Sequence, residues 1–340
     1  MIKIYFGTNR KPNQAPDPDD FGKGFSEHGL ASLRFGMAEV TGDDPDKFVL
    51  YVAPETLVEN RSRKIKGAPG SVLGSQDVFE RVRKKMIHHK RDTVIFILGY
   101  NVSFKEALTS AARLKRNLSV DKGGPGVNVV LFSWPSDGSM MPFIAYGNDR
   151  QDAQASGPGF ARGLLQVADF LRGSTAKDAC DQRLHLVAHS MGNYVLRHTV
   201  QEYVKQSSGR PARIFDRVLL MAADEDDDTF EYDHKMKPLP SLAKRVNVYF
   251  NNEDRAMAIS DKTKGNPDRL GDDGPRAPRS IPGKVTLIDA TPVVDGLVEH
   301  SYFLDTPRVV ADMQEILIRT PTDKIPGREY VQETNRYRLF

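Results

Sequence analysis

The feature that most constrains the fold of this chain is Ser190, a serine between two small residues where a strand pattern changes to a helix pattern. The apolar run 184–188 before it is typical of a buried parallel strand. Apolar side chains then recur at helical spacing as far as Val204. Ala188 and Gly192 leave room for the tight turn that such a junction requires. The sequence therefore predicts a strand–turn–helix junction that exposes a serine hydroxyl above a helix N-terminus.

From about residue 90 onward, apolar runs alternate with helical patterns, as they do in parallel β-α-β units. Strands are expected at 94–98, 127–132, 184–188, 216–221, 246–250 and 284–289. Helices are expected at 104–117, 160–172, 193–206 and 307–318, and a capping box of Ser103 and Glu106 opens the first. Because parallel crossovers are right-handed, these elements predict an α/β fold with a doubly wound, mostly parallel sheet and helices on both faces.

The first 90 residues have a less regular pattern, with strands expected at 2–6 and 48–53 and a helix near 76–89. We interpret them as the antiparallel leading edge of the same sheet, because a segment so poor in continuous apolar runs is a doubtful independent domain. The whole chain is then expected to be one domain. Its parts are a leading edge at 1–90, a catalytic core at 91–320 and a C-terminal tail at 321–340.

Two segments are expected to form loops at the edge of the sheet where the strands end. Residues 135–158 mix Pro, Gly and Ser with apolar side chains, and residues 256–283 are rich in Pro, Gly and charged residues. In an open parallel sheet, such loops build the binding site. An alternative for both is a surface connection with some apolar anchoring. If the first segment forms a substrate wall, its candidate contacts are Met141, Phe143 and Tyr146. Trp134, just before the segment, is a fourth candidate.

Catalysis by Ser190 needs a base and a group that orients the base, because a serine hydroxyl is a weak nucleophile at neutral pH. At an elbow of this kind the partners follow in the order acid, then histidine. Asp254 lies just beyond the strand expected at 246–250, and His300 lies in a loop before the final helix. Among eight histidines only His300 has the right position in chain order, and His189 is expected to point elsewhere on the elbow. We therefore predict Ser190 as nucleophile, Asp254 as orienting acid and His300 as general base.

The acid role has a second candidate in the five consecutive carboxylates at 224–228, which follow the strand expected to end at Met221. Some hydrolases take their acid from that strand, so this alternative stays open. Adjacent carboxylates cannot all face one metal ion, and the run is interpreted as a solvated loop with helix capping. The predicted chemistry requires no metal and no organic cofactor.

Two backbone N–H groups are expected to stabilise the oxyanion of a tetrahedral intermediate. One belongs to Met191, immediately after the nucleophile. The other belongs to Tyr100, in the turn that follows the strand expected at 94–98. Gly99, in the same turn, has the alternative interpretation of an ordinary turn glycine.

Composition excludes several other classes. The net charge of +3, from 48 basic and 45 acidic residues, gives no overall attraction to nucleic acid, and the basic residues in 81–91 are interpreted as the solvated side of a helix. The single cysteine, Cys180, excludes an internal disulfide and a zinc site built from several thiolates. No apolar run approaches the roughly 18 residues of a membrane span, and no secretory pattern opens the chain, so a cytoplasmic location is expected. The oligomeric state is left open.

Six segments together resemble an uncharacterised bacterial α/β-hydrolase family of the esterase/lipase superfamily; they are 6–10, 99–104, 132–136, 188–193, 252–256 and 299–303. The resemblance spans nearly the whole chain and implies an α/β-hydrolase fold with a Ser190–Asp254–His300 triad. Relatives usually carry His-Gly-Tyr-Asn where this chain has Leu98-Gly99-Tyr100-Asn101. That histidine is not a triad member, so its loss concerns the support of the oxyanion loop. The resemblance implies no particular substrate.

The first functional hypothesis is a serine hydrolase that cleaves small-molecule carboxylic esters through an acyl-enzyme. An amidase or peptidase would use the same residues. A hypothesis from another class is a binding or scaffold protein with a hydrolase fold and a vestigial triad. Ala188 and Leu98 favour this last hypothesis, and intact candidates at all three triad positions disfavour it.

Overall fold

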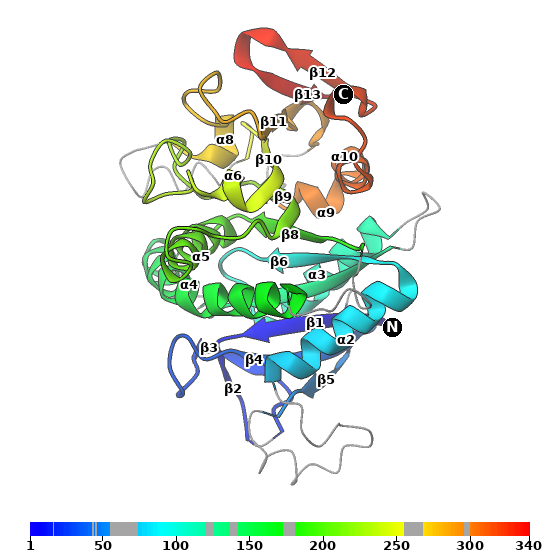
Figure 1. Ribbon diagram of the computed structural model, residues 1–340, viewed down its shortest axis with the longest axis vertical. Coiled ribbons are helices and arrows are strands. Elements are labelled where there is room, and N and C mark those ends of the chain that lie inside the picture. Colours follow the sequence, from blue (N-terminus) through cyan, green and yellow to red (C-terminus); the bar gives the residue numbers. More distant parts are fainter. Residues whose placement is uncertain are drawn as a thin grey trace.

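The computed structural model describes residues 1–15, 17–42, 44, 46–54, 74–119, 126–136, 142–172, 181–254, 268–295 and 300–340 (Figure 1). Its strands are β1 (Ile2–Thr8), β2 (Arg10–Pro12), β3 (Phe21–Phe25), β4 (Arg34–Val40), β5 (Phe48–Val52), β6 (Asp92–Ile97), β7 (Val127–Ser133), β8 (Leu184–His189), β9 (Phe215–Met221), β10 (Ala243–Phe250), β11 (Val285–Asp289), β12 (Arg328–Val331) and β13 (Arg336–Leu339). Its α-helices are α2 (Gly74–His89), α3 (Phe104–Leu118), α4 (Pro142–Arg172), α5 (Gly192–Gln206), α6 (Leu239–Leu242), α8 (Leu270–Asp273), α9 (Tyr302–Asp305) and α10 (Pro307–Ile318).

Eleven strands form one sheet in the order β12-β13-β11-β10-β9-β8-β6-β7-β1-β4-β5. Strands β1, β7, β6, β8, β9, β10 and β11 pair in parallel, and β4, β5 and β12 pair antiparallel with their neighbours. In Figure 1 the sheet extends from the red β12–β13 hairpin to the blue β4 and β5. The predicted α/β fold with a mostly parallel sheet is confirmed.

Helices cover both faces of the sheet, and alternate residues of each central strand point to opposite faces. In β6, Ile95 and Ile97 join the core under α2, α4 and α5, whereas Val94 and Phe96 join the core under α3, α9 and α10. This two-sided burial explains why the central strands are continuously apolar in sequence. The predicted capping box of Ser103 and Glu106 is present at the start of α3.

The structure corrects the loop expected at 135–158, because α4 already begins at Pro142 and continues through Pro158. The glycines that indicated a loop serve close packing instead. A Cβ at Gly157 would lie 2.6 Å from the Cβ of His198, so this glycine lets α4 approach α5. Of the second expected loop, residues 255–267 lie outside the described residues, and the remainder contains the short helix α8.

Both edges of the sheet also differ from expectation. β1 runs parallel to β7, and only β4 and β5 form the antiparallel edge. The sequence does not predict β4, because Gly36 interrupts the apolar pattern of this strand. Glycine is needed there, since a Cβ would lie 2.4 Å from the ring of Phe6. At the other edge, the expected tail at 321–340 supplies β12 and β13. In the described part of the chain, no helix is long and apolar enough to cross a membrane.

A buried ion pair attaches this C-terminal hairpin to the body of the protein. Arg328 of β12 donates to both carboxylate oxygens of Asp312 in α10, each at 2.7 Å, and Tyr249 of β10 donates to the same carboxylate. The side chains of Arg328 and Asp312 are 1% and 0% exposed. Removal of the arginine would therefore leave a buried carboxylate without its cation.

We predict that Arg328→Met lowers the free energy of unfolding by about 3–5 kcal/mol, because an unpaired buried charge is costly. The matched control is Arg338→Met on β13, where the arginine is 43% exposed and its pair with Asp289 spans 3.6 Å. That change should cost less than about 1 kcal/mol. Urea unfolding followed by circular dichroism measures both values. Equal losses in the two variants would contradict the assigned role of Arg328.

Candidate active site

Ser190 occupies a strained turn between β8 and α5. Its φ angle is +51°, in the left-handed region that costs a residue other than glycine on the order of 1–3 kcal/mol. Hydrogen bonds hold this conformation: Ser190 N–H donates to the Met221 carbonyl at 3.0 Å, and its own carbonyl accepts from Asp224 N–H at 3.2 Å. A Cβ at Gly192 would lie 2.5 Å from the carbonyl oxygen of Ile97, so glycine is needed here because the neighbouring strand β6 ends against the turn.

His300 and Asp254 are brought together although 46 positions separate them in the chain, with His300 Nδ1 2.7 Å from Asp254 Oδ2. Asp254 lies just after β10 and is 3% exposed. A neutral imidazole that donates from Nδ1 keeps its basic lone pair on Nε2. Within the described residues, that Nε2 atom is buried and has no hydrogen-bond partner. The contact with Asp254 therefore orients the His300 ring and leaves the Nε2 lone pair without a partner in the described part of the chain.

His189, the residue that precedes Ser190, contacts His300. Its Nε2 donates to the backbone carbonyl of His300 at 3.0 Å, and the two rings lie 4.7 Å apart. Burial, together with nearby His300, lowers the pKa of His189 to about 3, so the ring is neutral and Nε2 can keep its proton. The expectation that His189 points elsewhere missed this contact. No sequence pattern indicates it, because the contact depends on how the loop at 300 packs against the end of β8.

Tyr302 anchors the same loop from the other side. Its hydroxyl accepts a hydrogen bond from Ala222 N–H at 3.0 Å, and burial raises the pKa of this phenol well above its ordinary value. Ala222 directly follows Met221, whose carbonyl accepts from Ser190 N–H. The loop that carries His300 is therefore tied to the same strand end, β9, that holds the serine turn.

The turn after β6 packs directly against the serine. A Cβ at Gly99 would lie 2.8 Å from Ser190 Cβ and 3.2 Å from Ser190 Oγ. Glycine is thus required by the close approach to Ser190, beyond any role in the turn itself. The Trp134 indole donates to the Leu98 carbonyl at 2.8 Å and supports this turn. In the part of the chain described, no acceptor is found for the N–H groups of Met191 and Tyr100.

Within the described residues, the carboxylates at 224–228 contact cations and a tyrosine hydroxyl, and His300 contacts Asp254. Asp224 accepts from the Tyr146 hydroxyl at 2.7 Å, and Asp226 pairs with Arg269 at 2.7 Å and with Lys235 at 2.9 Å. The interpretation of this run as a solvated loop is wrong, because four of its members are buried: Asp224, Glu225, Asp227 and Asp228. No group of three or more metal-ligating side chains occurs among the residues whose placement is described.

The four expected substrate contacts have mixed positions. Trp134 and Tyr146 are buried, at 2% and 6% exposure, and the Tyr146 ring packs edge-on against Tyr100 at 5.8 Å. Met141 lies outside the described residues. Phe143 lies in α4, but its side chain is outside the described part. Substrate contact by these residues stays a prediction.

Comparison with known proteins adds family membership. A family model for an alpha/beta hydrolase of unknown function (DUF900) matches residues 75–320. An uncharacterized protein of Nostoc sp. is 23% identical in an alignment 328 positions long, and the match covers 76% of this chain and 82% of that protein. A solved Listeria innocua gene product is 12% identical with a TM-score of 0.36, over 69% of this chain and 97% of that one. A lipase-esterase related protein from Clostridium acetobutylicum is 17% identical with a TM-score of 0.23, over 64% and 82%. Since the family model spans most of the sequence, the chain belongs to the DUF900 family of α/β-hydrolases of unknown function.

Proposed function

We propose that this protein is a serine hydrolase that cleaves small carboxylic esters through an acyl-enzyme on Ser190. The observation that carries the proposal is the 2.7 Å contact between His300 Nδ1 and Asp254, which leaves Nε2 without a partner among the described residues. Further support comes from the strained turn at Ser190 and from the packing of Gly99 against its side chain.

In the first half of the proposed reaction, Ser190 Oγ attacks the ester carbonyl carbon while His300 Nε2 takes the hydroxyl proton. Asp254 stabilises the imidazolium that results. The N–H groups of Met191 and Tyr100 donate to the oxyanion of the tetrahedral intermediate. The intermediate then collapses, the bond to the alkoxide breaks, and His300 donates its proton to the departing alcohol.

In the second half, water attacks the acyl carbon of the Ser190 ester and passes a proton to His300. Collapse of this second intermediate returns the proton to Ser190 Oγ and releases the carboxylic acid. The cycle needs no metal or organic cofactor. An amide substrate would follow the same route with an amine as leaving group, and a binding or scaffold protein would carry out neither half.

A fluorophosphonate probe should label the wild-type protein at Ser190 and should not label Ser190→Ala. Asp254→Asn should label more slowly by about 10⁴-fold, as expected when a base loses its orienting carboxylate. Ser241→Ala, which changes an exposed serine, is the matched control and should label like the wild type. Mass spectrometry of the labelled peptide identifies the site. An unreactive wild-type protein would favour the binding or scaffold hypothesis.

His189→Ala should lower kcat on p-nitrophenyl esters by about 100-fold with little change in KM, because the loop that carries His300 loses one support. The control is His198→Ala, since burial also lowers the pKa of His198, to about 4, and its ring packs against Tyr194. Steady-state kinetics separates kcat from KM. If both variants lose the same activity, His189 acts only through general packing.

Gly99→Ala should reduce kcat by about 100-fold or more, because the added methyl group displaces the turn that carries the proposed Tyr100 donor. Gly283→Ala is the matched control, since a Cβ there meets no atom within 4 Å. Both proteins should keep the wild-type circular dichroism spectrum. Full activity in Gly99→Ala would remove this turn from the proposed mechanism.

A further inference from the structure

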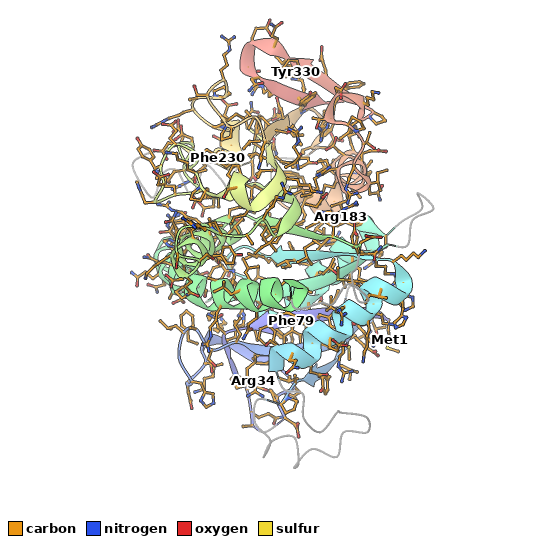
Figure 2. The ribbon with its side chains drawn as sticks, viewed as in Figure 1. Met1, Arg34, Phe79, Arg183, Phe230 and Tyr330 are labelled. Atoms are coloured by element: carbon orange, nitrogen blue, oxygen red, sulfur yellow. The ribbon has the colours of Figure 1, made fainter. Side chains whose placement is uncertain are left out.

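A second concave region lies at the opposite end of the parallel strands from Ser190. A cavity of about 610 Å³ opens there between the start of β1, the end of α2, the last turns of α3 and the start of β7. In Figure 2, Met1, one of its lining residues, lies beside α2 at the right of the view. Ser190 follows the last residue of β8, whereas the cavity lies at the first residues of the parallel strands, so a strand length of roughly 20 Å separates them.

Every charged side chain among the described residues that line this cavity is basic. Lys3 lies on β1, Lys85 on α2, Arg91 just before β6, and Lys115 and Arg116 on α3. This local excess contrasts with the chain as a whole, whose 48 basic and 45 acidic residues nearly balance. Glu39 on β4, outside the lining, pairs with Lys3 at 3.2 Å. From the sequence, the basic residues in 81–91 are interpreted as the solvated side of a helix. Two of them, Lys85 and Arg91, instead line this basic cavity.

Lys115 is the most informative member. Its Nζ donates to the Lys3 carbonyl oxygen at 2.7 Å, and within the described residues no carboxylate pairs with it. Burial, with repulsion from Arg91, Lys3 and Lys85, lowers the pKa of Lys115 to about 8. A partly buried ammonium without a counterion is unfavourable for the folded state. An anion bound in the cavity would offset that cost.

We propose that this cavity binds a small ligand that carries two or more phosphate groups. Several cationic side chains converge on this one concave site, and each phosphate group of a ligand supplies up to two negative charges in a small volume. The volume falls in the range of roughly 300–1,000 Å³ that is usual for small-molecule pockets. A concave site of this size favours a compact polyanion over nucleic acid, which needs an extended basic surface.

The test is isothermal titration calorimetry with sodium tripolyphosphate in about 0.15 M NaCl, an ionic strength that screens surface charges. The full-length protein should bind saturably at one site, and Lys115→Met should weaken binding by about tenfold or more. Lys23→Met, at an exposed lysine of β3 that does not line the cavity, should bind like the wild type. Ser190→Ala should also bind like the wild type, so failure of the proposed esterase activity and failure of this site are distinguishable.

Proton uptake gives a second readout. A polyanion near Lys115 should raise its pKa, so binding at pH 8 should take up about half a proton per ligand, measured by repeating the titration in buffers of different ionisation enthalpy. The other charged groups at the cavity are Lys3 on β1, Lys85 on α2, Arg91 before β6, Arg116 on α3 and the amino terminus at Met1. Lys115→Met should remove the share of the uptake that belongs to Lys115, measured as the difference from the wild type.

Lys85 is a half-buried residue near the end of α2, and Lys85→Gln provides an independent variant if Lys115→Met fails to fold. It should also weaken tripolyphosphate binding while the exposed-lysine control does not. The proposal is overturned if the wild type shows no saturable binding at millimolar tripolyphosphate. It is equally overturned if the cavity variants bind as tightly as Lys23→Met, since the attraction would then be a general surface effect.

Discussion

The arrangement at the candidate site depends on the hydrogen bond between His300 Nδ1 and Asp254. Each residue lies beyond a different strand of the parallel sheet, Asp254 after β10 and His300 after β11, so the bond joins two segments that no local interaction would hold together. The bond fixes the ring so that Nε2 is the basic nitrogen. The proposed chemistry at Ser190 requires such an oriented base, because a serine hydroxyl without one is a weak nucleophile.

Several contacts around this bond share one property: they converge on the ends of β8 and β9. At the end of β8, His189 Nε2 donates a hydrogen bond to the His300 carbonyl. Just after β9, Ala222 N–H donates to the Tyr302 hydroxyl. Met221 holds the strained backbone of Ser190. Strand ends in a parallel sheet are fixed by two-sided burial, and they provide rigid supports for loops that carry polar groups. The rigid core thus accounts for the persistence of a conformation that Ser190 would not adopt alone.

The sequence predicted the central strands and most helices because continuous apolar runs and helical spacing directly reflect burial. It failed where packing overrides local pattern, as at Gly157 and Pro158, whose residue types indicate a loop although they lie within a helix packed on α5. At the site, chain order selected Asp254 and His300, which the structure brings into contact. The support from His189 and the pairing of the carboxylates at 224–228 with arginine and lysine depend on contacts between distant segments, which no local pattern encodes.

The most direct test of the central claim is a crystal structure of the protein after reaction with a dialkyl p-nitrophenyl phosphate. We predict a phosphorus atom bonded to Ser190 Oγ and a phosphoryl oxygen within hydrogen-bond distance of the Met191 and Tyr100 N–H groups. His300 Nε2 should face the modified oxygen, with Asp254 still bonded to Nδ1. An unmodified Ser190, or an adduct from which the His300 ring is turned away, would contradict this prediction.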